Sequence, residues 1–152
     1  GRISKKKGKR TLERTLPEIL DRRQDIEFML VGEQQQSLNI PEKYDDRVTL
    51  VGPVSPQEIP KYYDKASFLI HPSLTEGLPR VILEALATGI PPIAREVGDI
   101  AYATENTFTS DSEFIEMVCN FESLHINSVD RFSIESVSAD YYRLFEKLLM
   151  DK

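Results

Sequence analysis

The chain has 152 residues, of which 40% are hydrophobic and 29% are charged. This size and composition are typical of one globular domain, and no apolar run reaches the roughly 18 residues that cross a bilayer. Cys119 is the one cysteine, which excludes an internal disulfide framework and a cysteine-based zinc site and favours a reducing compartment.

Charge is distributed unevenly along the chain. The formal net charge is −6, yet residues 1–14 carry seven basic side chains and one acidic side chain, for a net of +6, so the remaining 138 residues sum to −12. Nucleic-acid binding would need a basic stripe across the domain, which this pattern excludes. A short basic run on an acidic body suits a compact anion instead.

Hydrophobic periodicity predicts strands and helices in alternation. After a basic loop at 1–8, we expect a helix at about 9–21, strands at 26–31 and 47–51, a short helix at 55–65, a strand at 67–70, a helix from Pro79 to Gly89, a strand at 92–95, a weak strand near 107, a helix at 112–121, and a closing amphipathic helix capped by Ser133. This alternation predicts an α/β, Rossmann-like parallel sheet with helices on both faces. Ligands of such sheets bind at the carboxyl ends of the strands.

The opening segment resembles a loop that follows a strand, although no strand precedes it. We therefore expect residues 1–152 to be a single domain of a longer protein, with its first strand truncated.

The segment 71–94, HPSLTEGLPRVILEALATGIPPIA, is the most informative part of the chain. Pro79 and Gly89 are the expected start and stop signals of its helix. A helix N-terminus at the end of a strand suits a phosphate group, and the carboxylates of Glu76 and Glu84 suit hydroxyl groups beside it. Phosphate together with hydroxyls suggests a nucleotide sugar, although two such glutamates are more often ordinary surface residues.

The basic loop offers phosphate a planar guanidinium from Arg2 and mobile ammonium groups from Lys5, Lys6 and Lys7. Taken alone, this loop is more typical of a solvated basic tail.

Other candidates carry weaker signals. His71 lies at a strand end on the same edge, but a lone histidine is more often packed than catalytic. Tyr62 and Tyr63 are expected to be half-buried packing residues. The adjacent Asp45 and Asp46 are typical of a solvated turn, so we assign no metal site.

Taken together and in this order, these motifs resemble the C-terminal, donor-binding half of the retaining GT-B glycosyltransferases of family 4, or glycosyl transferases group 1. The opening GRISKKKG is similar to the phosphate loop of the family, and EGLPRVILEALATGIPPIA is similar to its Glu-x7-Glu segment. The closing FSIESVSADYYRLFEKLL is similar to its last helix. The central segment is the specific part of this resemblance, which spans nearly the whole chain.

The resemblance implies a catalytic role for three residues. Arg2 and Lys7 would hold the donor diphosphate and neutralise the charge that grows on the leaving nucleotide. Glu76 would accept hydrogen bonds from hydroxyl groups of the transferred sugar.

Four further residues would bind the donor. Gly77 and Leu78 would lend backbone amides near the diphosphate, Glu84 would bind the ribose hydroxyls, and Val54 would border the base. The resemblance implies a UDP- or GDP-sugar as donor substrate, with no cofactor and no divalent metal. The partner would be an N-terminal, acceptor-binding half of the same chain. The resemblance implies a cytoplasmic protein, and contact with the inner face of a membrane through the N-terminal half stays open.

Two positions depart from the family pattern. Leu78-Pro79 stands where the family often has Phe-Gly, and a proline cannot donate a backbone hydrogen bond. Val97-Gly98-Asp99 stands where Gly-Gly and then a glutamate are common, which bears on the choice of donor.

Two alternative functions stay open at this point. A sugar-nucleotide epimerase of GT-B architecture would need a set of acid–base histidine and carboxylate groups, which the sequence alone does not reveal. A non-catalytic domain, either a degenerate transferase or a doubly wound adaptor, is the other alternative.

Overall fold

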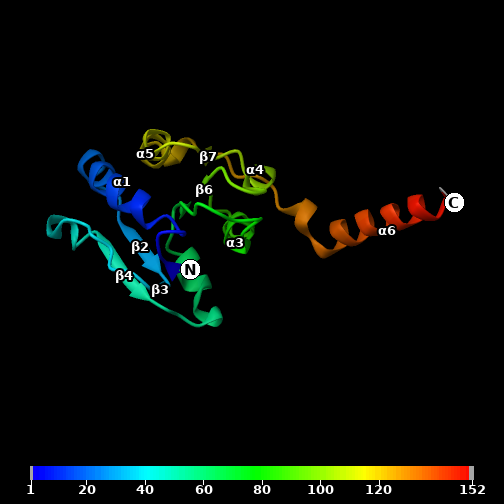
Figure 1. Ribbon diagram of the computed structural model, residues 1–152, viewed down its shortest axis with the longest axis horizontal. Helices are drawn as coiled ribbons and strands as arrows, with labels where there is room; N and C mark the ends of the chain where they lie inside the picture. The colour runs from blue at the N-terminus through cyan, green and yellow to red at the C-terminus, as the bar shows by residue number, and fades with distance from the viewer. Residues whose placement is uncertain (1, 151–152) are drawn as a thin grey trace.

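The protein is an α/β domain from which one long helix projects (Figure 1). The computed structural model describes residues 2–150, so Gly1, which opens the basic motif, lies outside the described residues. The strands are β1 (Arg2–Ile3), β2 (Phe28–Val31), β3 (Glu33–Gln34), β4 (Val48–Gly52), β5 (Leu69–His71), β6 (Pro92–Arg95) and β7 (Thr107–Phe108). The helices are α1 (Lys9–Arg22), α2 (Pro60–Tyr63), α3 (Arg80–Ala87), α4 (Ile100–Ala103), α5 (Asp111–Cys119) and α6 (Ile134–Met150).

All strand pairs in the described residues are parallel, as expected. They form three separate groups, β1–β3, β2–β4 and β5–β6–β7, rather than one continuous sheet. Strands β2 and β5 are not paired with each other, and the two-residue β1 pairs only with β3 among the described strands.

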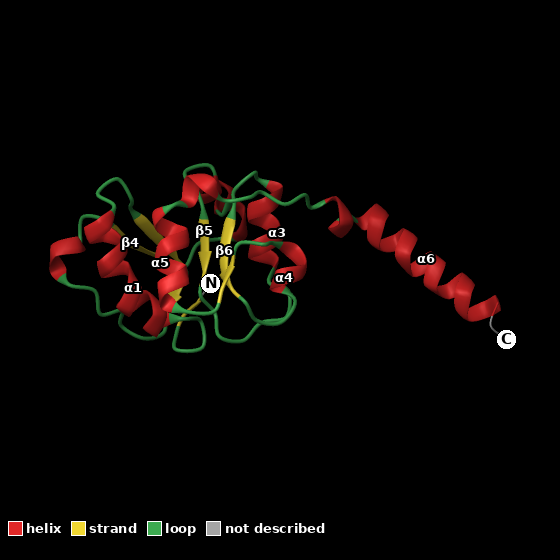
Figure 2. Ribbon diagram, turned by 90° about the horizontal axis from the view of Figure 1, so that it is seen from above, coloured by secondary structure: helices red, strands yellow, loops and turns green. Residues whose placement is uncertain are grey.

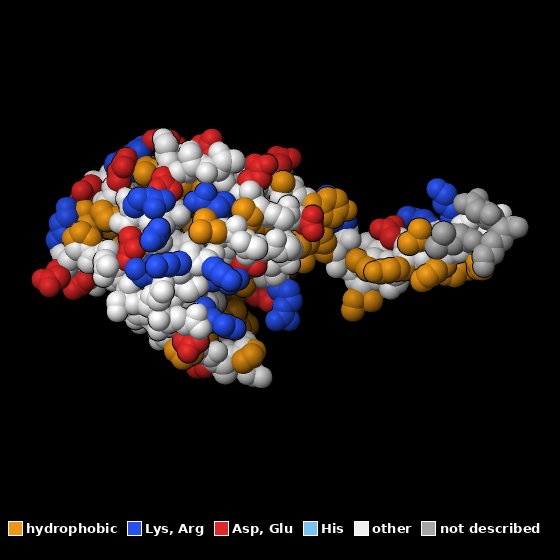
Figure 3. Space-filling model, in the orientation of Figure 1, with side chains coloured by type: hydrophobic (Ala, Val, Ile, Leu, Met, Phe, Trp, Pro, Cys, Tyr) orange, Lys and Arg blue, Asp and Glu red, His pale blue; other side chains and the backbone are white. Residues whose placement is uncertain are grey.

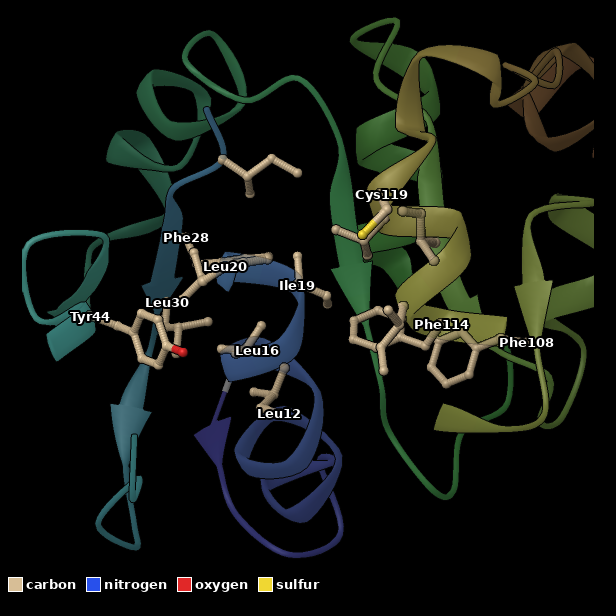
Figure 4. Close-up of a cluster of buried hydrophobic side chains, with 14 of the residues drawn as sticks. Leu12, Leu16, Ile19, Leu20, Phe28, Leu30, Tyr44, Phe108, Phe114 and Cys119 are labelled. Carbon is tan, nitrogen blue, oxygen red and sulfur yellow. The ribbon is translucent and has the colours of Figure 1, made fainter. Parts of the chain in front are cut away.

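Helices cover both faces of β6, which confirms the expected layering. Successive residues of a strand point to opposite faces. Ile93 belongs to the apolar cluster that contains α1 and α5, and Ala94 belongs to the cluster that contains α3 and α4. The larger cluster is shown in Figure 4, where Leu16 and Ile19 of α1 point toward the interior.

Several predicted boundaries need correction. Pro79 does not start its helix: its backbone is extended (φ −71°, ψ 131°), so it is the N-cap residue and α3 begins at Arg80. The helix predicted at 55–65 is divided into a 3₁₀ turn (Pro56–Glu58) and α2, because Pro60 has no N–H to continue the hydrogen-bond ladder. The expected capping box of Ser55 and Glu58 is present. Helix α4 was not predicted, since it has only four residues.

Helix α6 extends away from the rest of the molecule (Figures 1 and 2). Its expected cap is present, because Oγ of Ser133 accepts a hydrogen bond from the backbone N–H of Ser136 at 3.1 Å. Apolar side chains line one side of the helix and stay exposed, among them Tyr141 (59%) and Phe145 (57%) (Figure 3). Within residues 2–150, no helix is both long and apolar enough to span a membrane.

Candidate functional site

Two loops at the carboxyl ends of β1 and β5 interlock. Gly8, the N-cap of α1, has a positive φ of 84°, and a Cβ at this position would lie 2.2 Å from the carbonyl oxygen of Pro72. The backbone N–H of Leu74 donates to the carbonyl of Lys6 at 2.9 Å. Only glycine permits this approach, which fixes the basic loop against the loop that carries Glu76.

A third loop, after β6, packs on the same segment. Gly98 has a φ of 57°, and a Cβ there would lie 2.2 Å from the carbonyl oxygen of Glu76. The N–H of Asp99 donates to the carbonyl of Gly77 at 3.1 Å. The segment Val97-Gly98-Asp99 departs from the family pattern, but it keeps a glycine, and this glycine supports the loop of Glu76.

Four of the predicted site residues line one hollow of about 720 Å³: Arg2, Lys7, Glu76 and Glu84. Nζ of Lys7 lies 2.5 Å from Oε1 of Glu76, so the two are directly paired. The side chain of Lys7 is 40% exposed and that of Glu76 is 14% exposed. The sequence motifs at the two ends of this pair thus meet in space.

The carboxylate of Glu76 is surrounded by donors. Burial acts to raise the pKa of Glu76, but hydrogen bonds from Lys7 and Ser73 and the charge of Lys7 hold that pKa below its ordinary value. Nε2 of His71 lies 3.3 Å from the same Oε1. Burial lowers the pKa of His71, against the opposing effect of Glu76, so the imidazole is neutral near pH 7.

Glu84, on α3, has a partner that the sequence analysis missed. The hydroxyl of Tyr63, at the end of α2, donates to Oε2 of Glu84 at 3.1 Å. Burial and the neighbouring carboxylate raise the pKa of Tyr63, so the phenol stays protonated. Tyr63 is half-buried, as expected, but it also orients a candidate ligand group; the two residues are 21 positions apart, and no sequence signal connects them.

The remaining three predicted residues are not among the described residues that line the hollow. Val54 is half-buried in the loop after β4, and Gly77 is exposed. Leu78 packs with Val97 against the apolar cluster of α3 and α4, so its side chain anchors the loop. Their backbone roles toward a donor stay predictions.

The hollow continues away from these polar groups as an apolar slot between β2 and β5. Phe28 and Leu30 line one side, Phe68 and Ile70 line the other, and Leu12 of α1 also lines it. Arg2, Lys7 and Lys65 are the lysine and arginine residues among the described lining of the hollow, and Lys7 is the one paired with Glu76. Among residues 2–150, no three histidine, cysteine, aspartate or glutamate side chains gather as metal ligands would.

Comparisons with known proteins bear on this site. A sequence model of the family described as "Glycosyl transferases group 1" matches residues 1–120. D-inositol 3-phosphate glycosyltransferase of Pseudarthrobacter chlorophenolicus is 32% identical over 112 residues, which cover 68% of this chain and 27% of that protein. The phosphatidylinositol N-acetylglucosaminyltransferase GPI3 subunit of Saccharomyces cerevisiae is 25% identical over 118 residues, which cover 74% of this chain and 26% of that protein. The chain therefore spans about a quarter of the length of these curated relatives.

A solved structure shares the fold. Anabaena Alr3699/HepE, in its complex with UDP and glucose, matches 81% of this chain and 37% of its own chain, with a TM-score of 0.65 and 21% sequence identity. The same protein has also been solved with UDP-glucose and matches with a TM-score of 0.64. These matches confirm the α/β fold class that the sequence predicts.

Proposed function

This chain belongs to the group 1 glycosyltransferase family, and on that premise we propose that it is the donor-binding half of a retaining enzyme that transfers a hexose from a UDP- or GDP-sugar. The observation that carries the proposal is the shared hollow, which two cations, Arg2 and Lys7, and two carboxylates, Glu76 and Glu84, all line. The solved complexes of Alr3699/HepE with UDP and with UDP-glucose favour the same class of ligand.

In this proposal the diphosphate binds between Arg2 and Lys7. A guanidinium can hold two phosphate oxygens at once, and an ammonium on a flexible stem can follow the charge. Lys7 is 40% exposed, so its side chain is free to turn from Glu76 toward an incoming anion.

The two carboxylates would then bind the hydroxyl groups of the donor. Glu76 lies beside Lys7 and suits the sugar next to the diphosphate. Glu84 lies on the outer part of α3, held by Tyr63, and suits the ribose. In both positions a carboxylate would accept hydrogen bonds from hydroxyl groups of the donor.

Transfer breaks the bond between the anomeric carbon and the diphosphate oxygen, and the acceptor hydroxyl oxygen bonds to that carbon on the same face. The electron pair of the broken bond leaves with the nucleoside diphosphate, and the hydroxyl proton goes to a phosphate oxygen. Arg2 and Lys7 stabilise the negative charge that grows on the leaving group. We expect these fixed cations to support transfer without an added divalent ion.

The proposal also includes a second, acceptor-binding half in the intact protein. Residues such as Tyr141 and Phe145 leave an apolar face on α6 exposed, and such a face suits packing against another domain. The relatives' greater length is consistent with this arrangement.

We further propose that a strand leading into Arg2 fills the apolar slot between β2 and β5. The parallel register of β1 with β3, in which Arg2 pairs with Glu33, would place the preceding residues beside Phe28–Val31. A strand buried on both faces is expected to be apolar, as the slot requires.

Isothermal titration calorimetry tests the proposed ligand. UDP, GDP, UDP-glucose and GDP-mannose are titrated into the unmodified chain and into Lys7→Ala and Glu84→Gln. We expect micromolar binding of one nucleotide pair, weakened about tenfold or more in each variant, since hydrogen bonds to charged groups contribute roughly 1.5–3 kcal/mol. Lys147→Ala and Glu135→Gln, both exposed on α6, are the matched controls and should bind normally. Absence of binding by a chain with native circular dichroism would contradict the proposal.

One observation favours the epimerase alternative. The structure brings His71 within 3.3 Å of Glu76, a histidine–carboxylate pair that the sequence alone did not reveal. His71 approaches the same oxygen of Glu76 with which Lys7 already pairs, and this arrangement suits positioning better than proton exchange at a sugar carbon. Product analysis of the intact protein with UDP-sugars distinguishes the two: an epimerised nucleotide sugar formed without acceptor would support the alternative.

A further inference from the structure

The imidazole of His71 lines the hollow and has a buried nitrogen without a hydrogen-bond partner in the described part of the chain. Its side chain is 15% exposed, and the buried nitrogen is Nε2. The nearest acceptor is Oε1 of Glu76 at 3.3 Å, which is not aligned well enough for a hydrogen bond. Burying such a nitrogen without a hydrogen bond has an energetic cost.

The reason lies in the competition for one oxygen. Nζ of Lys7 lies 2.5 Å from Oε1 of Glu76, and Nε2 of His71 lies 3.3 Å from the same oxygen. The donor-binding role proposed above, on which this inference rests, requires Lys7 to turn to the diphosphate. Oε1 would then lose its strongest donor while the carboxylate is needed to accept sugar hydroxyls.

We infer that His71 is a positioning residue, which donates its Nε2–H to Glu76 once Lys7 has moved to the diphosphate. A shift of a few tenths of an ångström converts the 3.3 Å approach into an ordinary hydrogen bond. Ser73, which is buried and helps to hold the pKa of Glu76 below its ordinary value, acts on the same carboxylate. Together they keep Glu76 oriented toward the sugar while the cation serves the phosphate.

The structure of the chain supports this assignment. His71 is the last residue of β5, so its backbone is fixed by pairing with Ala94 of β6. The side chain therefore has a defined position relative to the loop of Glu76. A neutral imidazole also leaves the positive charges of Arg2 and Lys7 as the attraction for the diphosphate.

The test separates the sugar from the nucleotide. Calorimetry is performed with UDP and with UDP-glucose, or with the guanosine pair if that binds, on the unmodified chain and on His71→Leu and His71→Gln. We expect His71→Leu to bind the nucleoside diphosphate within about twofold of normal but to bind the nucleotide sugar about tenfold more weakly. His71→Gln, which keeps an N–H donor of similar reach, should recover most of the loss.

Three results would overturn the inference. One is a leucine variant that weakens both ligands equally, and another is a leucine variant that weakens neither. The third is a glutamine variant that recovers nothing while it remains folded. His125→Leu, an exposed histidine outside the hollow, is the matched control.

Two features keep the result interpretable. Failure of the proposed function would appear in the unmodified chain, as absence of binding of every nucleotide, whereas failure of the present inference appears only in the variants. If His71→Leu does not fold, ¹⁵N NMR of the unmodified chain with UDP-glucose decides the question. A protonated Nε2 on His71 is expected, and an unprotonated Nε2 would contradict the inference.

Discussion

Lys7 and Glu76 lie 69 positions apart in the sequence, and Nζ of the first is 2.5 Å from Oε1 of the second. The pair joins the basic loop after β1 to the loop after β5, which the close approach of Gly8 to Pro72 also holds together. Lys7 therefore has two alternative partners. It neutralises Glu76 in the free protein, and it is proposed to neutralise the diphosphate when the donor binds.

The pair makes stability depend on pH. The pKa of Glu76 is held below its ordinary value of 4.5, so the stabilisation is present above about pH 4.5 and is lost as the pH falls through the lower, folded-state pKa. Lys7→Met should therefore lower Tm at pH 6 and have a smaller effect at pH 3. Thermal unfolding at both pH values measures the difference. Lys147→Met, on α6, should be indifferent to pH in this comparison, and an equal effect of Lys7→Met at both pH values would contradict the account.

The interlocked loops predict a large difference between glycines that share a positive φ. Gly8→Ala and Gly98→Ala each place a Cβ 2.2 Å from a backbone oxygen. Gly89→Ala, at φ 76°, meets nothing within 4 Å and should cost only the roughly 1–2 kcal/mol of a left-handed backbone. We expect a loss of about 3 kcal/mol or more for each of the first two variants, measured by urea denaturation. Equal losses at all three positions would show that the loops do not pack as described.

Because helix α6 projects from the domain, replacing a phenylalanine on α6 should destabilise the chain less than replacing one in the core. Phe114 of α5 is fully buried, and Phe114→Ala should cost about 3–5 kcal/mol. Phe145 of α6 is 57% exposed, so Phe145→Ala should change the free energy of unfolding of this chain by less than about 0.5 kcal/mol. Urea denaturation of both variants checks this. A comparable loss for Phe145→Ala would mean that α6 packs against the body in solution.

The slot between β2 and β5 predicts an effect of added chain. The N–H of Phe28 donates to Arg47 on the β4 side, and the N–H of Leu69 donates to Pro91 on the β6 side. Alternation along a strand therefore points the N–H groups of Met29 and Ile70 toward the slot. An N-terminal extension of five valine and isoleucine residues should slow hydrogen exchange at these two amides and raise Tm.

A second extension of equal length, made of serine and asparagine, is the control for that experiment. It should leave exchange at Met29 and Ile70 unchanged, because it lacks the apolar side chains that the slot would bury. Equal protection by both extensions, or by neither, would contradict the proposal of a strand.

The alternating elements of the fold could be predicted because hydrophobic periodicity reports local burial. Strand β6 and helix α1 appear where the sequence places them, since each buries an apolar face against the core. The break between β2 and β5 could not be located, because it depends on which strands become neighbours. Helix α4 was missed because four residues are too few to show a periodic pattern. The extended backbone of Pro79 was missed because the φ of a proline suits both the N-cap and the first helical position.

The candidate site could be predicted in part. The sequence motifs and the family that they resemble pointed to Arg2, Lys7, Glu76 and Glu84, and the structure places all four around one hollow. The partners that orient them could not be foreseen, because Tyr63 and His71 carry no distinguishing neighbours in the sequence. Their roles depend on a hydroxyl and an imidazole that reach a carboxylate from another element.

The central claim, that this hollow binds a nucleotide sugar, is tested most directly by a crystal structure of the protein with the UDP- or GDP-sugar that calorimetry selects. The account predicts diphosphate oxygens within hydrogen-bond distance of Arg2 and Lys7, ribose hydroxyls on Glu84, and Nζ of Lys7 withdrawn from Glu76. A nucleotide bound elsewhere on the surface, with the Lys7–Glu76 pair intact, would contradict it.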